Sequence, residues 1–433
     1  MGIKKLRVGT RRSQLALVQT EYVIKELTKI CSFECEIVKI DTIGDNILDI
    51  PLPKIGEKAL FTRELEVALE LHQIDIVVHS LKDLPTTLPS KLVIGAILKR
   101  VCSEDVVIIN TQKHSIKNIE LLPNNSIIGT SSLRRMAQIR HTYPHLIVKD
   151  IRGNINTRIR KLDEGQFDAI ILASAGLQRL NWEDKIAQVL DDKNYYYAVG
   201  QGVLAVECLE SRIDILSLLA PLNHISTIVQ ILAERTFLKT IQGGCSAPVG
   251  VRTILKEIDG KISQVTLCGM VSDLEGKERL VEKFTMDLYS DNINRETLNS
   301  SASNRLANKI DKKYNKDSAA HIITGIYLNP SGSSHIDIKD IEFNEEATEF
   351  PNIDMKINTE DSKKRAALHN PDDKGNDESQ LKNHNDSILN KEAVNENLVT
   401  MYLNAEKCGH TLAEMMLNQG ALEILTKVRE GNL

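Results

Sequence analysis

The sequence predicts an α/β protein in which two α/β domains precede a small α+β domain that carries a long disordered insertion. Roughly the first 210 residues alternate short β-rich runs with helical patterns, which is typical of largely parallel sheets. A series of strand-like runs after residue 245 predicts one antiparallel sheet. The 433-residue length also exceeds what a single core usually organises, so two or three domains are expected.

The first strand and helix are predicted close to the start of the chain. "LRVGT" (6–10) predicts a strand, and "SQLALVQTEYVIKELTKI" (13–30) predicts a helix for which Ser13 is the N-cap. Ala16, Val23, Leu27 and Ile30 fall on one face of this helix.

Two segments of the α/β region resemble each other. "QIDIVVHS" (73–80) and "QFDAIILA" (166–173) each lead from a helix into a short buried strand. Chance could produce such a pair, but two similar α/β domains would also produce it, and the rhythm of the composition favours the second explanation. "AVGQGVLAVEC" (198–208) then predicts a strand that returns to the first domain.

The character of the chain changes after residue 220. "NHISTIVQILAERTFLKTIQGG" (223–244) predicts an amphipathic helix, and the strands of the antiparallel sheet follow it. Residues 291–397 are rich in Asn, Lys, Asp and Ser and cannot bury enough apolar surface to offset the entropy of ordering, so we expect disorder. "HIITGIYL" (321–328) is the one strand-like patch inside it, and "GHTLAEMMLNQGALEILTKV" (409–428) predicts a closing helix. The predicted domains are 1–100 with 198–219, then 101–197, then 220–290 with 398–433, with 291–397 as a polar, mostly disordered insertion in the third.

Bulk composition excludes several classes of protein. A formal net charge of -5 argues against general nucleic-acid binding. Seven irregularly spaced cysteines do not form a disulfide framework, and Cys31 and Cys35 lack a second ligand pair, so we expect a reducing compartment and no metal. Without a membrane-spanning apolar run or a signal peptide, the expected location is the cytoplasm, or an organelle if a targeting extension was removed.

Cationic and hydroxyl side chains recur where predicted strands give way to helices. In open α/β sheets ligands bind beyond the carboxyl ends of the strands, near helix N-termini that attract anions. Any single arginine there is most often a solvated residue, but the recurrence favours a ligand with several carboxylates or phosphates. The set consists of Arg11, Ser13, Thr130, Ser131, Ser132, Arg134, Arg135, Arg152 and Arg158, and Lys54 and Lys58 on a glycine-containing loop add to it.

Two further motifs carry reactive groups. In "VVHSLKDLP" (77–85), Lys82 and Asp83 follow a buried strand; a lone aspartate in a loop is usually a cap, but beside a cationic site it suits the stabilisation of a developing positive charge. In "QGGCSAPVG" (242–250), Cys245 could be a nucleophile, a metal ligand, an attachment point or a small apolar filler.

Six motifs in one order resemble the porphobilinogen deaminase (hydroxymethylbilane synthase) family over about residues 5–288 and the final helix. That family condenses four porphobilinogen molecules head to tail into linear hydroxymethylbilane and releases ammonia at each step. The chain grows on a dipyrromethane cofactor held by a thioether to a cysteine. The resemblance implies two domains like those of periplasmic binding proteins and a small third domain that bears the cysteine. The motifs are "HSLKDLP", "GTSSLRR", "RGNINTR", "DAIILASAGLQRL", "AVGQG" and "GGCSAP".

The resemblance assigns a role to each matching residue. Cys245 is implied as the covalent attachment point and Asp83 as the catalytic carboxylate. Positions that hold the acetate and propionate groups of the cofactor are Ser80, Lys82, Thr130, Ser132, Arg134 and Arg135. Positions that bind or line the substrate are Arg11, Ser13, Gln19, Lys58, Arg152, Arg158, Arg179 and Gln201, with Phe61 packing on a pyrrole ring. The implied partner is porphobilinogen, bound by a monomer without nucleic acid or membrane.

The sequence departs from the family pattern at Tyr197 and is also compatible with two alternative functions. Tyr197 stands where the family commonly has proline, so the segment leading into the next strand is expected to be looser. A non-catalytic, two-domain anion-binding protein would explain the arginines but not Asp83 and Cys245, and such a protein usually carries an export signal. A redox or metal role for Cys245 would require a partner cysteine or histidine that its motif lacks.

Overall fold

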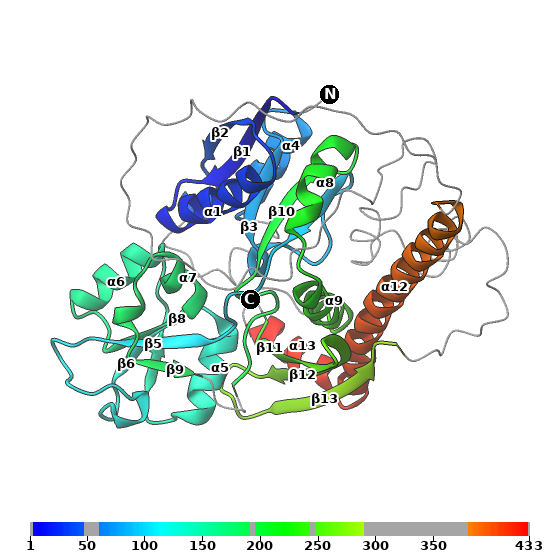
Figure 1. Ribbon diagram of the computed structural model, residues 1–433. Coiled ribbons are helices and arrows are strands. Elements are labelled where there is room, and N and C mark those ends of the chain that lie inside the picture. The colour runs from blue at the N-terminus through cyan, green and yellow to red at the C-terminus, as the bar shows by residue number, and fades with distance from the viewer. Residues whose placement is uncertain (1–2, 47–59, 191–194, 243–246, 290–379, 432–433) are drawn as a thin grey trace. The chain divides into compact units, whose positions relative to one another are not determined.

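The computed structural model of the protein describes residues 3–46, 60–190, 195–242, 247–289 and 380–431, with no side chains at 46 and 380–396. The chain divides into two compact units, Met1–Ile336 with Val399–Leu433, and Asp337–Leu398. Three sheets lie in the first unit (Figure 1). The strand-like patch at 321–328 and most of the predicted insertion lie outside the described residues.

The first sheet has five strands in the order β2-β1-β3-β10-β4. β1 runs parallel to β2 and β3, whereas β10 runs antiparallel to both β3 and β4. The strands are β1 Lys5–Arg11, β2 Glu34–Ile40, β3 Ile76–Ser80, β4 Leu92–Ile97 and β10 Leu204–Leu209. The strand predicted at 198–208 therefore does return to the first sheet, between β3 and β4.

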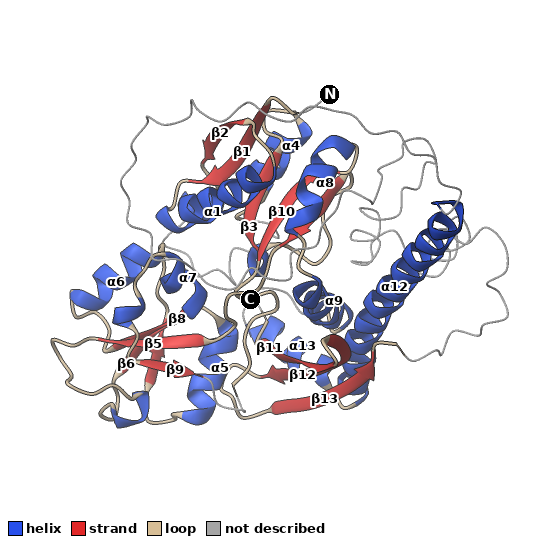
Figure 2. Cartoon of the chain, in the orientation of Figure 1, coloured by secondary structure: helices blue, strands red, loops and turns tan. Residues whose placement is uncertain are grey.

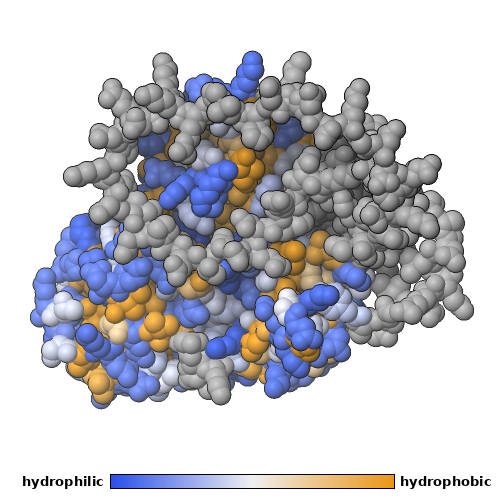
Figure 3. Space-filling model, in the orientation of Figure 1, coloured by the Kyte–Doolittle hydropathy of each residue, from blue (hydrophilic) through white to orange (hydrophobic). Residues whose placement is uncertain are grey.

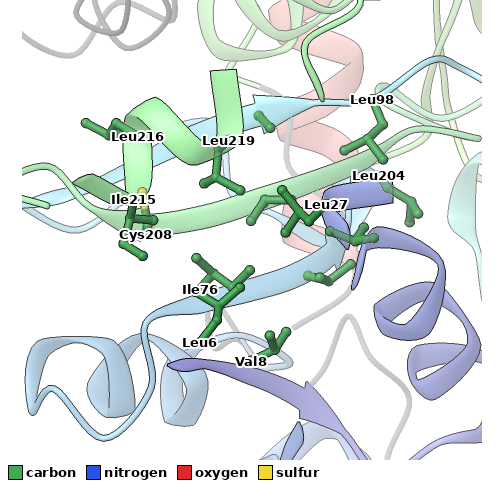
Figure 4. Close-up of a cluster of buried hydrophobic side chains, with 14 residues drawn as sticks. Leu6, Val8, Leu27, Ile76, Leu98, Leu204, Cys208, Ile215, Leu216 and Leu219 are labelled. Atoms are coloured by element: carbon green, nitrogen blue, oxygen red, sulfur yellow. The ribbon is translucent and has the colours of Figure 1, made fainter. Parts of the chain in front are cut away.

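Helices cover both faces of this sheet (Figure 2). Alternate residues of β3 face opposite sides: Ile76 packs with α1 and α8, and Val77 packs with α4. Figure 4 shows the first of these clusters, in which Leu27 of α1 and Leu219 of α8 approach the sheet. The helices are α1 Gln14–Ile30, α2 Ile43–Asn46, α4 Arg63–Glu70 and α8 Ile213–Leu219, with the 3-10 helices η1 Leu81–Asp83 and η4 Ala220–Leu222.

Helix α1 begins as the sequence predicts. The Ser13 hydroxyl accepts a hydrogen bond from the backbone N–H of Ala16 at 3.3 Å, which satisfies one donor of the first turn. Of the four residues on the apolar face, Ala16, Val23 and Leu27 are buried, whereas Ile30 has an exposed fraction of 46%. Ile30 is the last helical residue, where the chain turns out toward β2.

The second sheet repeats the strand order of the first. Its order is β7-β6-β8-β5-β9, with β6 parallel to β7 and β8 and with β5 antiparallel to β8 and β9. The strands are β5 Asp105–Ile109, β6 Ile127–Gly129, β7 Ile147–Lys149, β8 Ala169–Ala173 and β9 Gln188–Leu190. The helices are α5 Leu133–Thr142, α6 Ile155–Asp163 and α7 Ser174–Arg179, with η2 Ile119–Leu121 and η3 Glu183–Lys185.

The internal resemblance read from the sequence has a structural counterpart. β3 and β8 occupy the same position in their sheets, each between a parallel and an antiparallel neighbour. Asp75, just before β3, donates its N–H to Arg7 O at 2.8 Å and accepts from Arg7 N at 2.9 Å. Asp168, just before β8, makes the same pair of bonds to Ile127 at 2.8 and 2.7 Å. The two α/β halves therefore share a local hydrogen-bond arrangement as well as an order of strands.

The third sheet is antiparallel, as predicted. β11 pairs with β12 through a turn in which Asp259 and Gly260 both have positive φ, the geometry of a tight hairpin. Helix α9 packs against β11 and β12, and α13 packs against β12. The elements are β11 Val249–Ile258, β12 Lys261–Ser272, β13 Arg279–Asp287, α9 Ile225–Thr240, α12 Gln380–Asn418 and α13 Ala421–Gly431.

The closing helix differs from its prediction at both ends. It begins at Gln380, inside the segment assigned to the insertion, because 380–397 has no proline or glycine and continues directly into the packed part of α12. It breaks at Gly420, whose φ of 95° ends one helix before α13 starts. One predicted helix is therefore two.

Tyr197 is held in place, contrary to the loosening expected from its substitution for proline. Its backbone pairs with Val251 of β11 through bonds of 3.0 and 2.8 Å, one of which uses an N–H that proline lacks. Its hydroxyl accepts from Thr253 N at 2.8 Å. Tyrosine here therefore ties the segment before β10 to the third sheet.

The described surface is mostly hydrophilic on the face shown in Figure 3, with small apolar patches between polar side chains. Within the described ranges, no individual helix has the length and apolarity needed to cross a membrane. The bent pair Ile213–Leu222 and Ile225–Thr240, with an angle of 107° at its break, meets that test on length and composition alone.

Candidate functional site

A small cavity of about 60 Å³ lies at the carboxyl ends of β1 and β3. Six residues singled out from the sequence line it, although they come from separate segments of the chain. The six are Arg11, Ser13, Gln19, Phe61, Ser80 and Asp83. This is the edge of the sheet where parallel α/β folds bind ligands.

Arg11 is positioned by an ion pair and by an aromatic ring. Its Nε donates to Asp45 Oδ2 at 2.9 Å, and its guanidinium lies 4.3 Å from the centre of the Phe61 ring. Burial acts to lower the pKa of Arg11, but the carboxylates of Asp45 and Asp83 hold that pKa above its ordinary value. Arg11 therefore remains a cation at the edge of the cavity.

The turn that carries Asp83 follows β3 directly. Gln19 of α1, which is 4% exposed, donates from Nε2 to Ser80 Oγ at 2.9 Å and so links the helix to the end of the strand. The backbone N–H of Leu81 donates to Val203 O at 2.9 Å, and η1 then turns the chain so that Asp83 lines the cavity. Beneath the turn, the buried His79 contacts Glu207 of β10, with 3.0 Å between Nε2 and Oε2.

A second group of predicted residues lies at the N-terminus of α5. Ser132 is the N-cap, and its backbone N–H donates to Thr130 Oγ1 at 3.2 Å. Arg134 and Arg135 are 4% and 6% exposed, and both pair with the buried carboxylate of Asp105 at 2.8 and 2.7 Å. The two cations hold the pKa of Asp105 well below its usual range, although burial alone would raise it.

Other predicted cations surround this pair. Burial lowers the pKa of Lys82 to about 8; Asp83 opposes the shift, whereas Arg134 and Arg135 add to it. Burial likewise lowers the pKa of Arg158 to about 10, with contributions from Arg135 and Arg152. Burial and two neighbouring arginines thus act together to lower the pKa of each of these groups.

Two further predicted residues bond to the segments at which β5 and β10 begin. Gln201 donates from Nε2 to Ser103 O at 2.6 Å and to Asp105 Oδ1 at 2.8 Å. Arg179, at the end of α7, donates to Gly202 O at 2.9 Å, and burial lowers its pKa to about 10.

The residues present fit an anionic cofactor such as dipyrromethane with its acetate and propionate groups. Buried Nε atoms of Arg134 and Arg135 have no hydrogen-bond partner among the residues that the structure describes. A carboxylate that accepted from them would satisfy these donors and offset the repulsion that adds to the effect of burial on the pKa of Lys82 and Arg158. No group of three or more His, Cys, Asp or Glu side chains that could hold a metal ion occurs in the described ranges.

The structure thus brings most of the predicted residues into two groups. One lines the cavity beside β1 and β3; the other surrounds the N-terminus of α5 and includes Arg152 and Arg158 near α6. Asp83 connects the groups, because its charge acts on Arg11, Lys82 and Arg158. Lys54, Lys58 and Cys245 lie outside the described residues.

Sequence reasoning missed the carboxylates that pair with these cations, and it missed the buried pair of Arg100 and Glu234. Asp45 pairs with Arg11, and Asp105 pairs with Arg134 and Arg135. Glu234 of α9, which is fully buried, accepts two bonds of 2.8 Å from Arg100 and one of 2.9 Å from Gly200 N. Each partner is distant in the sequence, so no local pattern indicates the pairing; an acidic residue at the start of an apolar strand, as at Asp105, was the one available signal.

Comparison with known proteins identifies the family. The family model "Porphobilinogen deaminase, dipyromethane cofactor binding domain" matches residues 6–217, and "Porphobilinogen deaminase, C-terminal domain" matches residues 228–308. The chain is 47% identical over 286 residues to the porphobilinogen deaminase of Synechococcus sp. (strain CC9605), which covers 66% of this chain and 88% of that protein. For the porphobilinogen deaminase of Prochlorococcus marinus (strain AS9601) the identity is 44% over 324 residues, with 75% of this chain and 97% of that protein covered.

Solved structures give weaker matches. The match to the periplasmic VFT2 domain of Bordetella pertussis BvgS has 14% sequence identity and covers 50% of this chain and 85% of the VFT2 chain. Its TM-score of 0.30 is too low to establish a shared fold. The assignment therefore depends on the family models and on the extent of the sequence identity. With both domains of the family matched and 88% of a relative covered at 47% identity, the chain belongs to the porphobilinogen deaminase family.

Proposed function

We propose that this member of the family is a hydroxymethylbilane synthase in which Asp83 is the catalytic carboxylate and Cys245 carries the dipyrromethane cofactor. The enzyme joins four porphobilinogen molecules head to tail into linear hydroxymethylbilane and releases one ammonia for each. The observation that carries the assignment of the site is the cavity that Asp83 shares with Arg11, Ser13 and Phe61. Its cationic edge suits the carboxylate substituents of a pyrrole.

Each group has a separate task in this proposal. Arg11, Ser13, Arg152 and Arg158 bind the acetate and propionate of the incoming porphobilinogen, and Phe61 packs on its ring. As the aminomethyl group leaves as ammonia, positive charge spreads over the pyrrole, and the nearby Asp83 carboxylate stabilises that charge. Gln19, Lys58, Arg179 and Gln201 complete the lining.

When bound, the cofactor, built from the same substrate, would supply the free pyrrole carbon to which the first porphobilinogen is joined, and each later unit is joined to the one added before it. Ser80, Lys82, Thr130 and Ser132 would hold its carboxylates together with Arg134 and Arg135. The paired arginines at the N-terminus of α5 support this role, because their forked donors and the helix dipole both favour carboxylates.

Mass spectrometry of the intact protein tests attachment and reaction class together. Purified wild-type protein should carry an extra mass of two pyrrole units that persists after denaturation, and Cys245→Ser should lose both the mass and the activity. Asp83→Asn should keep the mass but release ammonia from porphobilinogen far more slowly. An active protein without the adduct would contradict the assignment, and carboxylate binding without ammonia release would favour a non-catalytic anion-binding protein.

Monomeric state and location are further parts of this proposal. We expect a monomer, which the resemblance to the family implies. We expect a cytoplasmic location, or an organellar one if a targeting extension was removed, on the basis of the irregularly spaced cysteines and the predicted reducing compartment. Light scattering of the purified protein tests the first point, and imaging of the tagged full-length protein tests the second.

A further inference from the structure

A buried arginine of the third domain contacts the turn that carries Asp83. Arg235 of α9 is 3% exposed, and its guanidinium donates to the backbone carbonyls of Leu84 at 3.3 Å and Pro85 at 2.6 Å. These two residues directly follow Asp83. A charged donor to two carbonyls holds the backbone more firmly than a neutral one does, because charge-assisted hydrogen bonds are stronger.

The other side of the same turn is held by the segment before β10. Leu81 N donates to Val203 O at 2.9 Å. A Cβ added to Gly200 would lie 3.2 Å from Lys82 N, so the backbone at Gly200 is in close contact with the start of the turn. Gly200, with φ of 74°, in turn donates its N–H to the Glu234 carboxylate.

Neighbouring residues of α9 therefore act on the turn from both sides. Glu234 holds Gly200, which packs on the start of η1, and Arg235 holds the carbonyls that follow it. Helix α9 ends at Thr240, five positions before Cys245. The helix that leads to the proposed attachment cysteine is thus also the helix that fixes the backbone of the catalytic turn.

We infer that Arg235 is a positioning residue that sets the place of the Asp83 carboxylate relative to the pyrrole attached through the third domain. The inference rests on the proposed function, since it assumes that Asp83 acts on the bound pyrrole. Arg235 itself binds neither substrate nor cofactor in this role. A misplacement of about 1 Å at a reacting centre can lower a rate by about a hundredfold, so the contact is sufficient to matter for turnover.

The test uses the holoenzyme and compares Arg235→Met and Arg235→Lys with Arg140→Met. Arg140, a residue of α5, also joins the third domain to the rest of the protein, through bonds of 2.9 and 2.7 Å to Leu274 O and Glu275 in the loop between β12 and β13, and neither partner belongs to the catalytic turn. Steady-state kcat and KM for porphobilinogen, and the intact mass of each variant, are the measurements.

Arg235→Met should retain the dipyrromethane mass while kcat falls by about ten- to a hundredfold and KM stays within about twofold, because Asp83 is displaced and the carboxylate-binding cations are not. Arg235→Lys, which keeps one charged donor, should recover part of kcat, and Arg140→Met should keep kcat within about twofold. In an Asp83→Glu background, where the carboxylate is already displaced, Arg235→Met should add less than about threefold.

The outcomes separate this inference from the proposed function. A wild-type protein without the adduct or without turnover overturns the proposed function itself. If the wild type is loaded and active, a kcat for Arg235→Met within twofold of wild type overturns the positioning role, as does an equal loss in Arg140→Met. Should Arg235→Met fail to fold, the same comparison is made with Arg235→Lys, for which an unchanged kcat is the refuting result.

Discussion

Removal of the negative charge on Asp105 is the sharpest test of how the paired arginines are held. Asp105→Asn keeps the shape of the side chain but leaves Arg134 and Arg135 without their shared counter-ion. Asp105 accepts from Arg135 Nη2 at 2.7 Å, from Gln201 Nε2 at 2.8 Å and, by ion pairing, from Arg134 Nη1 at 2.8 Å, and it is fully buried.

The size of the effect follows from these contacts. Two hydrogen bonds between charged groups contribute about 1.5–3 kcal/mol each, and removal of one partner from a buried ion pair typically costs about 3–5 kcal/mol. Asparagine retains one acceptor, so we expect a loss of about 3–5 kcal/mol in the free energy of unfolding of the cofactor-free protein. With a urea m-value of about 3 kcal/mol/M, the midpoint should fall by about 1 M or more.

Urea unfolding monitored by circular dichroism, in a Cys245→Ser background and with Cys245 intact, measures this loss. The loss should be smaller in the cofactor-loaded protein, because cofactor carboxylates can then pair with the arginines. Asp214→Asn, which removes an ion pair to Arg212 in which the aspartate is 46% exposed, is the control and should cost less than about 1 kcal/mol. A loss below 1 kcal/mol for Asp105→Asn in both backgrounds would refute the reasoning.

Three further predictions follow from single contacts. Lys82→Met should stabilise the cofactor-free protein at pH 7 by about 1–3 kcal/mol, because burial lowers the pKa of Lys82 in the folded protein to about 8. Between pH 8 and the ordinary lysine pKa only the unfolded chain holds the proton, so the stability of the wild type rises with pH. The stability that the variant gains over the wild type should therefore shrink in urea titrations at pH 9 and 10. A gain that does not depend on pH would contradict the assigned cause. Gly202→Ala should lower the free energy of unfolding by several kcal/mol and lower the thermal midpoint, because Gly202 has a φ of 84° and a Cβ there would lie 1.7 Å from Cys102 O. A midpoint equal to that of the wild type would show that the backbones at Gly202 and Cys102 are not in contact. Phe61→Leu should raise KM for porphobilinogen about two- to fivefold, because it removes a cation–π contact with Arg11 that contributes about 0.5–1 kcal/mol. An unchanged KM would show that Phe61 does not contribute to substrate binding.

Local features of the fold could be predicted from the sequence because their signals are local. Ser13 caps α1, and α9 occupies Ile225–Thr240 within the segment that showed helical periodicity. The repeated QxD segments before β3 and β8 indicated two similar halves, and the structure shows that the aspartates make matching bonds. The three strands of the last sheet were also predicted, because hairpins join neighbours in the sequence.

Features that depend on distant partners could not be predicted in this way. Motif matching grouped Arg11, Asp83 and Phe61, and the cavity that they share is consistent with that grouping. It did not find Asp45, Asp105 or Glu234, since each pairs with a cation far along the chain and carries no periodic signal. Nor could composition show that α12 starts at Gln380, because a polar segment continuous with a packed helix has the same composition as a disordered one.

The strand order of the two α/β sheets has a consequence for synthesis on the ribosome. All five strands of the second sheet lie between Asp105 and Leu190, whereas β4 of the first sheet has β10, at Leu204–Leu209, as its neighbour. An emerging chain can therefore close the second sheet while β4 still lacks its partner. We expect the N-terminal sheet to be the later of the two to reach its native pairing, so that an arrested chain that has emerged from the ribosome only as far as residue 200 would expose β3 and β4 to proteases and chaperones while the second sheet is already protected.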